Sequence, residues 1–142
     1  MKKSLTTFWT LVLFLLLTGN RCNDSTITTE VDAQEKISDS QGGFDGNLND
    51  GDQFGSAIAS IGDLEGDGVD DLAVGAPFDD DNGENRGAVW ILFMDSDGRV
   101  DLERKISDDE GGFNGNLDND DLFGSAIASI GDLNNDGVLD LA

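Results

Sequence analysis

Two short acidic stretches, 69 residues apart, carry the same pattern of oxygen-bearing side chains. Residues 63–71 read DLEGDGVDD, and residues 132–140 read DLNNDGVLD. In both, an Asp, Glu or Asn occupies positions 1, 3, 5 and 9, and a Gly occupies position 6. A hard divalent cation such as Ca²⁺ binds several converging oxygen atoms, and a Gly permits the sharp turn that brings them together. The spacing therefore predicts two calcium-binding loops.

The recurrence extends well beyond these loops. Aligning residues 36–73 with residues 105–142 gives 28 identical positions out of 38. A fixed period with this identity indicates that one structural unit has been duplicated. We expect a leader at 1–19, a linker at 20–35, a first repeat at 36–104 and a second, truncated repeat at 105–142.

Each repeat is expected to contain four strands, which the apolar segments 54–61, 72–76, 87–93 and 100–106 indicate. The first segment has small side chains. The third is apolar without alternation, as in a strand covered on both faces, and the fourth alternates, as in a half-exposed strand. No stretch after the leader has helical periodicity. This progression is typical of a β-propeller blade that runs from the axis to the rim.

The chain is strongly acidic, with 30 Asp and Glu, 8 Lys and Arg, and a formal net charge of -22. Such a charge repels nucleic acid and anionic membrane surfaces, so neither is an expected partner. It also opposes folding through self-repulsion, which bound cations would relieve. A disordered acidic tail is the alternative, and the apolar runs between the acidic loops argue against it.

The N-terminus has the pattern of an export signal. Lys2 and Lys3 precede the apolar run 8–17, and cleavage is expected after Gly19. The apolar run is too short to span a bilayer comfortably, so no membrane span is expected in the mature chain. Arg21 stands where a bacterial lipoprotein signal places a small residue, so a lipid anchor on Cys22 is not expected. A single Cys also excludes an internal disulfide bond.

Three motifs together resemble the FG-GAP repeat, which builds the β-propeller of integrin alpha subunits and occurs in many secreted bacterial proteins. They are Phe54-Gly55, the acidic loop from Gly62 to Gly68, and Asp71 to Pro77, which reads DLAVGAP. The resemblance covers residues 36–142. It implies an all-β fold of four-stranded antiparallel blades, here about one and a half blades of a larger propeller.

The resemblance also implies a ligand set for Ca²⁺ at each loop. Each set consists of four side chains and the backbone carbonyl oxygen of position 7. In the first loop, Glu65 departs from the usual Asp or Asn at position 3. The second repeat stops before a Val-Gly-Ala-Pro segment, so we expect a fragment of a longer protein. The implied ligands are Asp63, Glu65, Asp67, Val69 and Asp71 in the first loop, and Asp132, Asn134, Asp136, Val138 and Asp140 in the second.

Other interpretations of the acidic segments remain. Each loop could be an acidic hairpin turn of the Asp-Gly type. An EF-hand would need a bidentate Glu at position 12, where the first loop has Val74. Residues 95–101 are predicted to form a hairpin. Residues 79–84 are predicted to form a solvated loop, with a cation site as the alternative, and Trp90 is predicted to lie in the core.

Catalysis has few candidate groups in this sequence. The chain has no His, which excludes a Ser-His-Asp triad and a His-ligated zinc site, and no active site is expected. The leading hypothesis is an extracellular calcium-binding propeller segment that acts as an adhesion or ligand-binding module for a protein or polysaccharide. The alternatives are the scaffold of a larger secreted enzyme and a passive cell-surface repeat protein.

Overall fold

The computed structural model describes residues 12–15, 31 and 33–142, and these residues form eight β-strands and no helix. None of them therefore belongs to a helix that could cross a bilayer. The expected cleavage point after Gly19 and the side chain of Cys22 lie outside the described residues. The strands are β1 (Val12–Leu15), β2 (Gln34–Ile37), β3 (Ile58–Gly62), β4 (Asp71–Ala76), β5 (Ala88–Met94), β6 (Val100–Ile106), β7 (Ser129–Gly131) and β8 (Asp140–Leu141).

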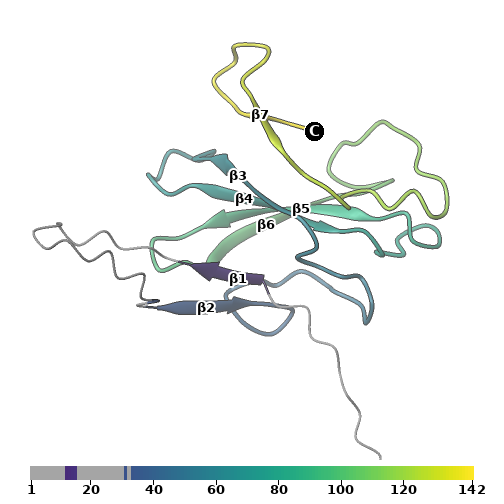
Figure 1. Cartoon of the computed structure of the whole chain (residues 1–142), viewed down its shortest axis with the longest axis horizontal. Coiled ribbons are helices and arrows are strands. Elements are labelled where there is room, and N and C mark those ends of the chain that lie inside the picture. The colour runs from purple at the N-terminus through teal and green to yellow at the C-terminus, as the bar shows by residue number, and fades with distance from the viewer. Residues whose placement is uncertain (1–11, 16–30, 32) are drawn as a thin grey trace, which may run out of the picture.

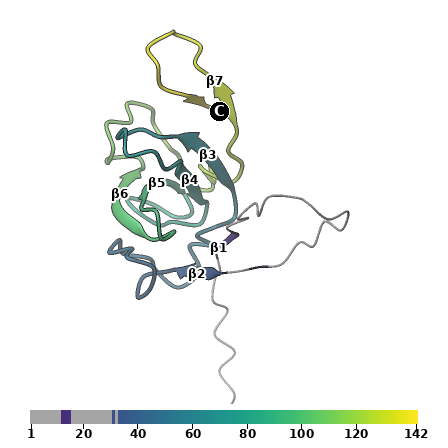
Figure 2. The ribbon, with the colours of Figure 1, turned by 90° about the vertical axis from the view of Figure 1, so that its left-hand side faces the viewer.

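A four-stranded antiparallel sheet forms the centre of the molecule, with the strand order β3-β4-β5-β6. Consecutive strands are neighbours, so each connection is a hairpin or a loop between adjacent strands. The predicted all-β fold and its four-stranded antiparallel sheet are confirmed. The β1–β2 pair lies on one side of this sheet and the β7–β8 hairpin on the other (Figures 1 and 2).

Side chains that alternate along β4 and β5 form two apolar layers, one on each face of the sheet. Val74 and Leu92 belong to the layer covered by Phe44 and Phe54 of the preceding loop. Ala73 and Val89 belong to the opposite layer, which residues of the second repeat, such as Phe123, help to cover. Because successive strand residues point to opposite faces, the unbroken apolar run in β5 buries side chains in both layers, as predicted.

The first strand begins later than the sequence indicates. We expected it from residue 54, but β3 starts at Ile58. Gln53 and Gly55 have φ angles of 55° and 92°, in the left-handed region that an extended strand does not use. The chain therefore turns here before it enters the sheet.

The hairpin between β5 and β6 is confirmed. The Asp95 N–H donates to the Arg99 carbonyl at 2.8 Å, and the Asp95 carboxylate accepts the N–H of Asp97 at 2.8 Å. This segment therefore has its own local acceptor and needs no cation to close the turn.

Candidate functional site

The first predicted calcium loop connects β3 to β4 and is closed by the side chain of Asp63. Its carboxylate accepts backbone N–H groups from Gly66 at 2.6 Å, Asp67 at 3.1 Å and Gly68 at 2.9 Å. The hydrogen bond from Gly68 is the main cause that lowers the pKa of Asp63; desolvation opposes it, and the hydrogen bonds from Gly66 and Asp67 add to the lowering. The carboxylate is thus held in its charged form at the centre of the turn.

The second loop, between β7 and β8, repeats this hydrogen-bond pattern. The Asp132 carboxylate accepts the N–H groups of Asp136 at 3.1 Å and Gly137 at 2.9 Å. The Val138 N–H donates to Asp136 at 2.8 Å, the same distance that joins Val69 to Asp67 in the first loop. The two loops therefore share one local conformation.

The last predicted ligand of each loop also ties the loop to its own start. The Asp71 carboxylate accepts the Leu64 N–H at 2.8 Å, and Asp140 accepts the Leu133 N–H at 2.7 Å. Asp71 is fully buried, and its other oxygen accepts the Met94 N–H at 3.0 Å. The sequence predicted a ligand here but not this second role, in which Asp71 joins the loop to the end of β5.

Glu65 faces a concentration of negative charge. Its pKa is raised by desolvation and by the charges of Asp67, Asp71, Asp101 and Asp63, in that order. Asp101 lies on β6, and no sequence motif marks it, because the β5–β6 hairpin brings it near the loop only in the folded sheet. This repulsion is the kind that a bound cation would relieve.

The predicted ligands lie in the same turns, but the carboxylates of the six Asp residues among them accept backbone N–H groups. Among the residues that the structure describes, no three acidic, thiol or imidazole groups are placed so that they could hold a metal ion. The donor chemistry still suits Ca²⁺, because all the side-chain donors are oxygen atoms and each carboxylate has about four lone-pair sites. Asp63, with three N–H partners, retains further acceptor capacity.

A second acidic cluster lies where a solvated loop was predicted. Asp79 is 1% exposed, and its carboxylate contacts the Lys105 ammonium at 2.7 Å. Lys105 also pairs with Asp81 and lies 5.4 Å from the ring centroid of Trp90, which is buried in the core as predicted. The interpretation of residues 79–84 as a solvated loop was therefore wrong for Asp79. The partner, Lys105, stands 26 residues away and is brought close only by the pairing of β5 with β6.

Asp52 lies at the edge of this buried cluster and is 3% exposed. Burial raises its pKa to about 6, and the negative charges of Asp79 and Asp80 act in the same direction. A hydrogen bond from the Asn49 N–H, at 2.7 Å, and the charge of Lys105 oppose the shift without cancelling it. Asp52 therefore favours the protonated form at mildly acidic pH.

The raised pKa of Asp52 predicts that the free energy of unfolding decreases with rising pH. Its contribution is fully present below the ordinary value of 3.8 and is lost as the pH rises through about 6. The shift corresponds to about 3 kcal/mol at most. Asp52→Asn keeps an oxygen acceptor for Asn49 but cannot ionise, so the variant should gain stability relative to the unaltered chain between pH 4 and pH 7. Urea unfolding across this pH range measures the difference, and parallel curves would contradict the assignment.

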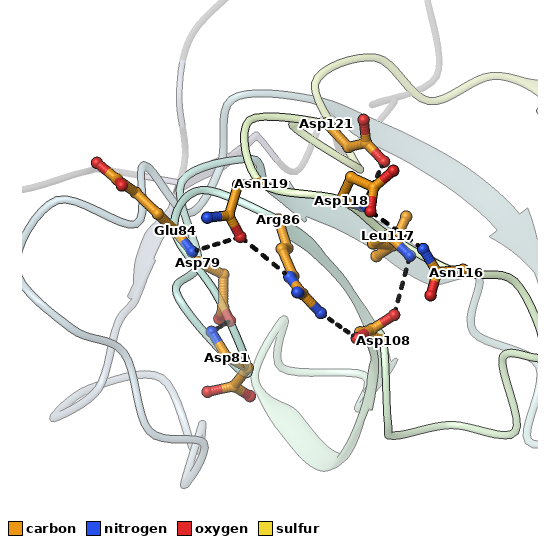
Figure 3. A network of polar contacts seen from close by, with 10 residues as sticks. All are labelled: Asp79, Asp81, Glu84, Arg86, Asp108, Asn116, Leu117, Asp118, Asn119 and Asp121. Carbon is orange, nitrogen blue, oxygen red and sulfur yellow. Dashed lines mark hydrogen bonds and ion pairs between the residues drawn. The ribbon is translucent and has the colours of Figure 1, made fainter.

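The first repeat contacts the second through the loop that precedes β5 (Figure 3). The Arg86 guanidinium pairs with Asp108, whose other oxygen accepts the Leu117 N–H at 2.9 Å. The Asn119 side-chain oxygen accepts the Glu84 N–H at 3.2 Å and the Arg86 Nε–H at 3.4 Å. One guanidinium therefore bridges two groups of the second repeat.

Main-chain contacts complete the junction between the repeats. The Asp120 N–H donates to the Glu84 carbonyl, and the Phe123 N–H donates to the Arg86 carbonyl, both at 2.9 Å. Gly75 on β4 lies so close to Gly124 that a Cβ atom at Gly75 would stand 1.9 Å from the Gly124 carbonyl oxygen. A Cβ atom at Gly124 would in turn stand 2.4 Å from the Ala88 carbonyl oxygen, so both positions need glycine for the repeats to approach this closely.

Part of the central sheet matches a known repeat family. The FG-GAP repeat family model matches residues 54–92, from the turn before β3 to the middle of β5. This segment is an FG-GAP repeat. The FG-GAP repeat thus spans the first acidic loop and Gly75, and the four-stranded sheet built on it is a β-propeller blade.

Integrin alpha subunits are similar to the FG-GAP region of this chain. Mouse integrin alpha-2 is 37% identical over 92 residues, human integrin alpha-6 is 39% identical over 90 residues, and Chinese hamster integrin alpha-3 is 39% identical over 89 residues. Each match covers 63% of this chain, but only 7% of the first two relatives and 8% of the third. The matched part of the chain therefore spans less than a tenth of the length of these relatives.

Proposed function

We propose that this chain is an extracellular segment of a calcium-stabilised β-propeller that acts as an adhesion or ligand-binding module. Residues 1–19 would be the export signal and 20–35 a linker. Residues 36–104 and 105–142 would be two FG-GAP units. The ligand would be a protein or a polysaccharide outside the cell, and the role would not be enzymatic.

The observation that carries the proposal is the shared conformation of the two acidic loops. Four equivalent N–H donors contact equivalent carboxylates in both loops, although the residues at positions 3, 4 and 8 differ. Such a turn fixes the backbone of the acidic residues before any ion binds. The side chains of Asp63, Glu65, Asp67 and Asp71, with the Val69 carbonyl, would hold Ca²⁺ in the first loop, and those of Asp132, Asn134, Asp136 and Asp140, with the Val138 carbonyl, in the second.

Calcium would supply positive charge at the point where Glu65 is surrounded by other acids. The residues of this chain orient the site: Asp63 closes the turn, and Asp71 fixes it to the end of β5. Relief of repulsion would stabilise the blade, because the net charge of the chain opposes folding. The ion would thus tie β3 to β4 without any disulfide bond.

Calcium removal is expected to lower the melting temperature. If each loop binds with a Kd of about 100 μM, about 1 mM Ca²⁺ adds about 1.4 kcal/mol per loop. Thermal unfolding with 1 mM Ca²⁺ and with EDTA measures this effect. Isothermal titration should show two sites, with the first loop tighter because it has four acidic ligands where the second has three.

Three substitutions show which residues bind Ca²⁺. Asp67→Ala should abolish one calorimetric site and Asp136→Ala the other. Asp97→Ala removes an exposed acid from the β5–β6 hairpin and should leave both sites intact. No saturable Ca²⁺ uptake by the unaltered chain, or equal losses in all three variants, would refute the proposal.

A further inference from the structure

The loop between β4 and β5 contains one of the two Asn-Gly pairs of the sequence, Asn82-Gly83, and the other is Asn114-Gly115. Such a pair is chemically labile, because the backbone nitrogen of Gly can attack the side-chain amide carbon of Asn and no Cβ atom on Gly obstructs the approach. Asn82 is exposed, and its side chain makes no hydrogen bond to the residues that the structure describes. Its amide is therefore open to water and free to rotate.

The backbone of this pair is weakly held. Asn82 has a φ angle of 60°, in the left-handed region that few residues other than glycine adopt. The Gly83 N–H donates to the Asp80 carbonyl at 3.3 Å, which is longer than the usual N–H to oxygen distance. The nitrogen that would attack the Asn82 side chain therefore gives up little hydrogen-bond energy when it leaves its acceptor.

The guanidinium of Arg86 lies against Gly83. A Cβ atom placed on Gly83 would stand 2.1 Å from the Arg86 Nε and 2.5 Å from the side-chain oxygen of Asn119. Attack on the amide requires the Gly83 nitrogen to lose its proton, and a positive charge close by stabilises the anion that forms. Arg86 therefore favours the reaction at Asn82.

The same loop contacts the second repeat on the other side of Gly83. The Glu84 N–H donates to the Asn119 side-chain oxygen at 3.2 Å (Figure 3). The Asn85 side-chain amide donates to the Asp120 carboxylate at 2.7 Å. A change in the backbone at Gly83 therefore displaces groups that hold the two repeats together.

We propose that Asn82-Gly83 is a site of non-enzymatic deamidation, and that the modification loosens the contact between the two repeats. The Gly83 nitrogen loses its proton and bonds to the side-chain carbonyl carbon of Asn82. The bond from that carbon to the amide nitrogen breaks, and ammonia leaves with the proton. Water then adds to either carbonyl carbon of the resulting succinimide ring and leaves Asp or isoaspartate at position 82. The net reaction consumes one water molecule and releases one ammonia.

Both products disturb the loop. Isoaspartate routes the main chain through the former side chain and lengthens it by one methylene group, so Glu84 and Asn85 no longer lie opposite their acceptors. Either product also adds a carboxylate beside Asp79, Asp80 and Asp81, where like charges repel one another. The contact with the second repeat should therefore weaken as the chain ages.

The test ages the full chain in mildly alkaline buffer, and tandem mass spectrometry measures the deamidation of each Asn. Asn82 should convert, and a protease should then cut residues 117–142 faster than in a fresh preparation. Asn82→Gly suits the positive φ but lacks the amide, so its aged form should be cut no faster than its fresh form. Asn114→Ala removes the other labile pair and should still show the faster cleavage on ageing.

A matched pair of variants tests the role of the positive charge. Arg86→Lys and Arg86→Gln both remove the guanidinium, but only Lys keeps the charge. Asn82 should deamidate about two- to fivefold faster in the Lys variant than in the Gln variant, as expected for a partly exposed charge. In urea, which removes the fold, the two rates should be equal.

Four results would contradict these expectations. If Asn82 reacts in urea but stays intact in the folded chain, it is not a modification site of this protein. Conversion of Asn82 without faster cleavage, or equal acceleration in aged Asn82→Gly, would overturn the effect on the repeats. Equal rates in the folded Lys and Gln variants would overturn the role of Arg86.

Discussion

Replacing Lys105 with Met is expected to lower the free energy of unfolding by about 3–5 kcal/mol. The substitution leaves Asp79 without its cation although the side chain is 1% exposed, and a buried charge without a partner is strongly destabilising. Burial alone would lower the pKa of Lys105, but hydrogen bonds and charges from Asp79 and Asp81 outweigh it and raise the pKa. The ammonium is therefore charged at every physiological pH.

Urea unfolding measures this loss, and two variants define its cause. Arg104→Met removes a positive charge from the exposed neighbouring position on β6 and should change the stability by less than about 1 kcal/mol. Adding Asp79→Asn to Lys105→Met removes the isolated charge and should recover part of the loss. If Lys105→Met and Arg104→Met have the same effect, the ion pair does not stabilise the blade.

Gly75→Ala is expected to separate the two repeats. Gly75 does not have a positive φ, so the backbone of β4 accepts Ala, but the new Cβ atom would stand 1.9 Å from the Gly124 carbonyl oxygen. Both atoms belong to strands or turns fixed by hydrogen bonds, since the Gly75 N–H donates to the Ala57 carbonyl at 2.9 Å. The collision should cost about 3 kcal/mol or more, at the upper end of the range for overpacking.

Limited proteolysis reports this separation directly. Residues 117–142 of the Gly75→Ala variant should be cleaved faster than in the unaltered chain, while the central blade stays resistant. Gly51→Ala is the control, because a Cβ atom at Gly51 meets nothing within 4 Å and only its φ of 109° is strained. Equal protection of the C-terminal repeat in both variants would show that the Gly75–Gly124 contact does not hold the repeats together.

The local features of the blade follow from short-range sequence patterns. The unbroken apolar run 87–93 predicts a strand covered on both faces, and β5, which spans Ala88–Met94, is such a strand. Asp95 and Gly98 predict the hairpin that follows it. Both predictions succeed because alternation and turn chemistry act over a few residues. The start of β3 was predicted too early because the left-handed turn at Gln53 leaves no strong mark in the sequence.

The contacts of the charged residues could not be predicted from local patterns, because their partners are distant in sequence. Asp79 looked like one of several solvated acids, yet the pairing of β5 with β6 places Lys105 beside it. Arg86 was not singled out by any motif, and it bridges Asp108 and Asn119 of the next repeat. Asp101 likewise approaches Glu65 only in the folded sheet.

The sequence by itself determined the repeat, the all-β blade and the two acidic turns, since period, alternation and loop chemistry are properties of neighbouring residues. Only the tertiary structure decided which charges are buried, how one repeat contacts the next and which strand pairs with β2. These depend on contacts between residues 20 to 40 positions apart, such as Lys105 with Asp79 and Asn119 with Glu84. No local pattern encodes such distances, because the folding of the sheet creates them.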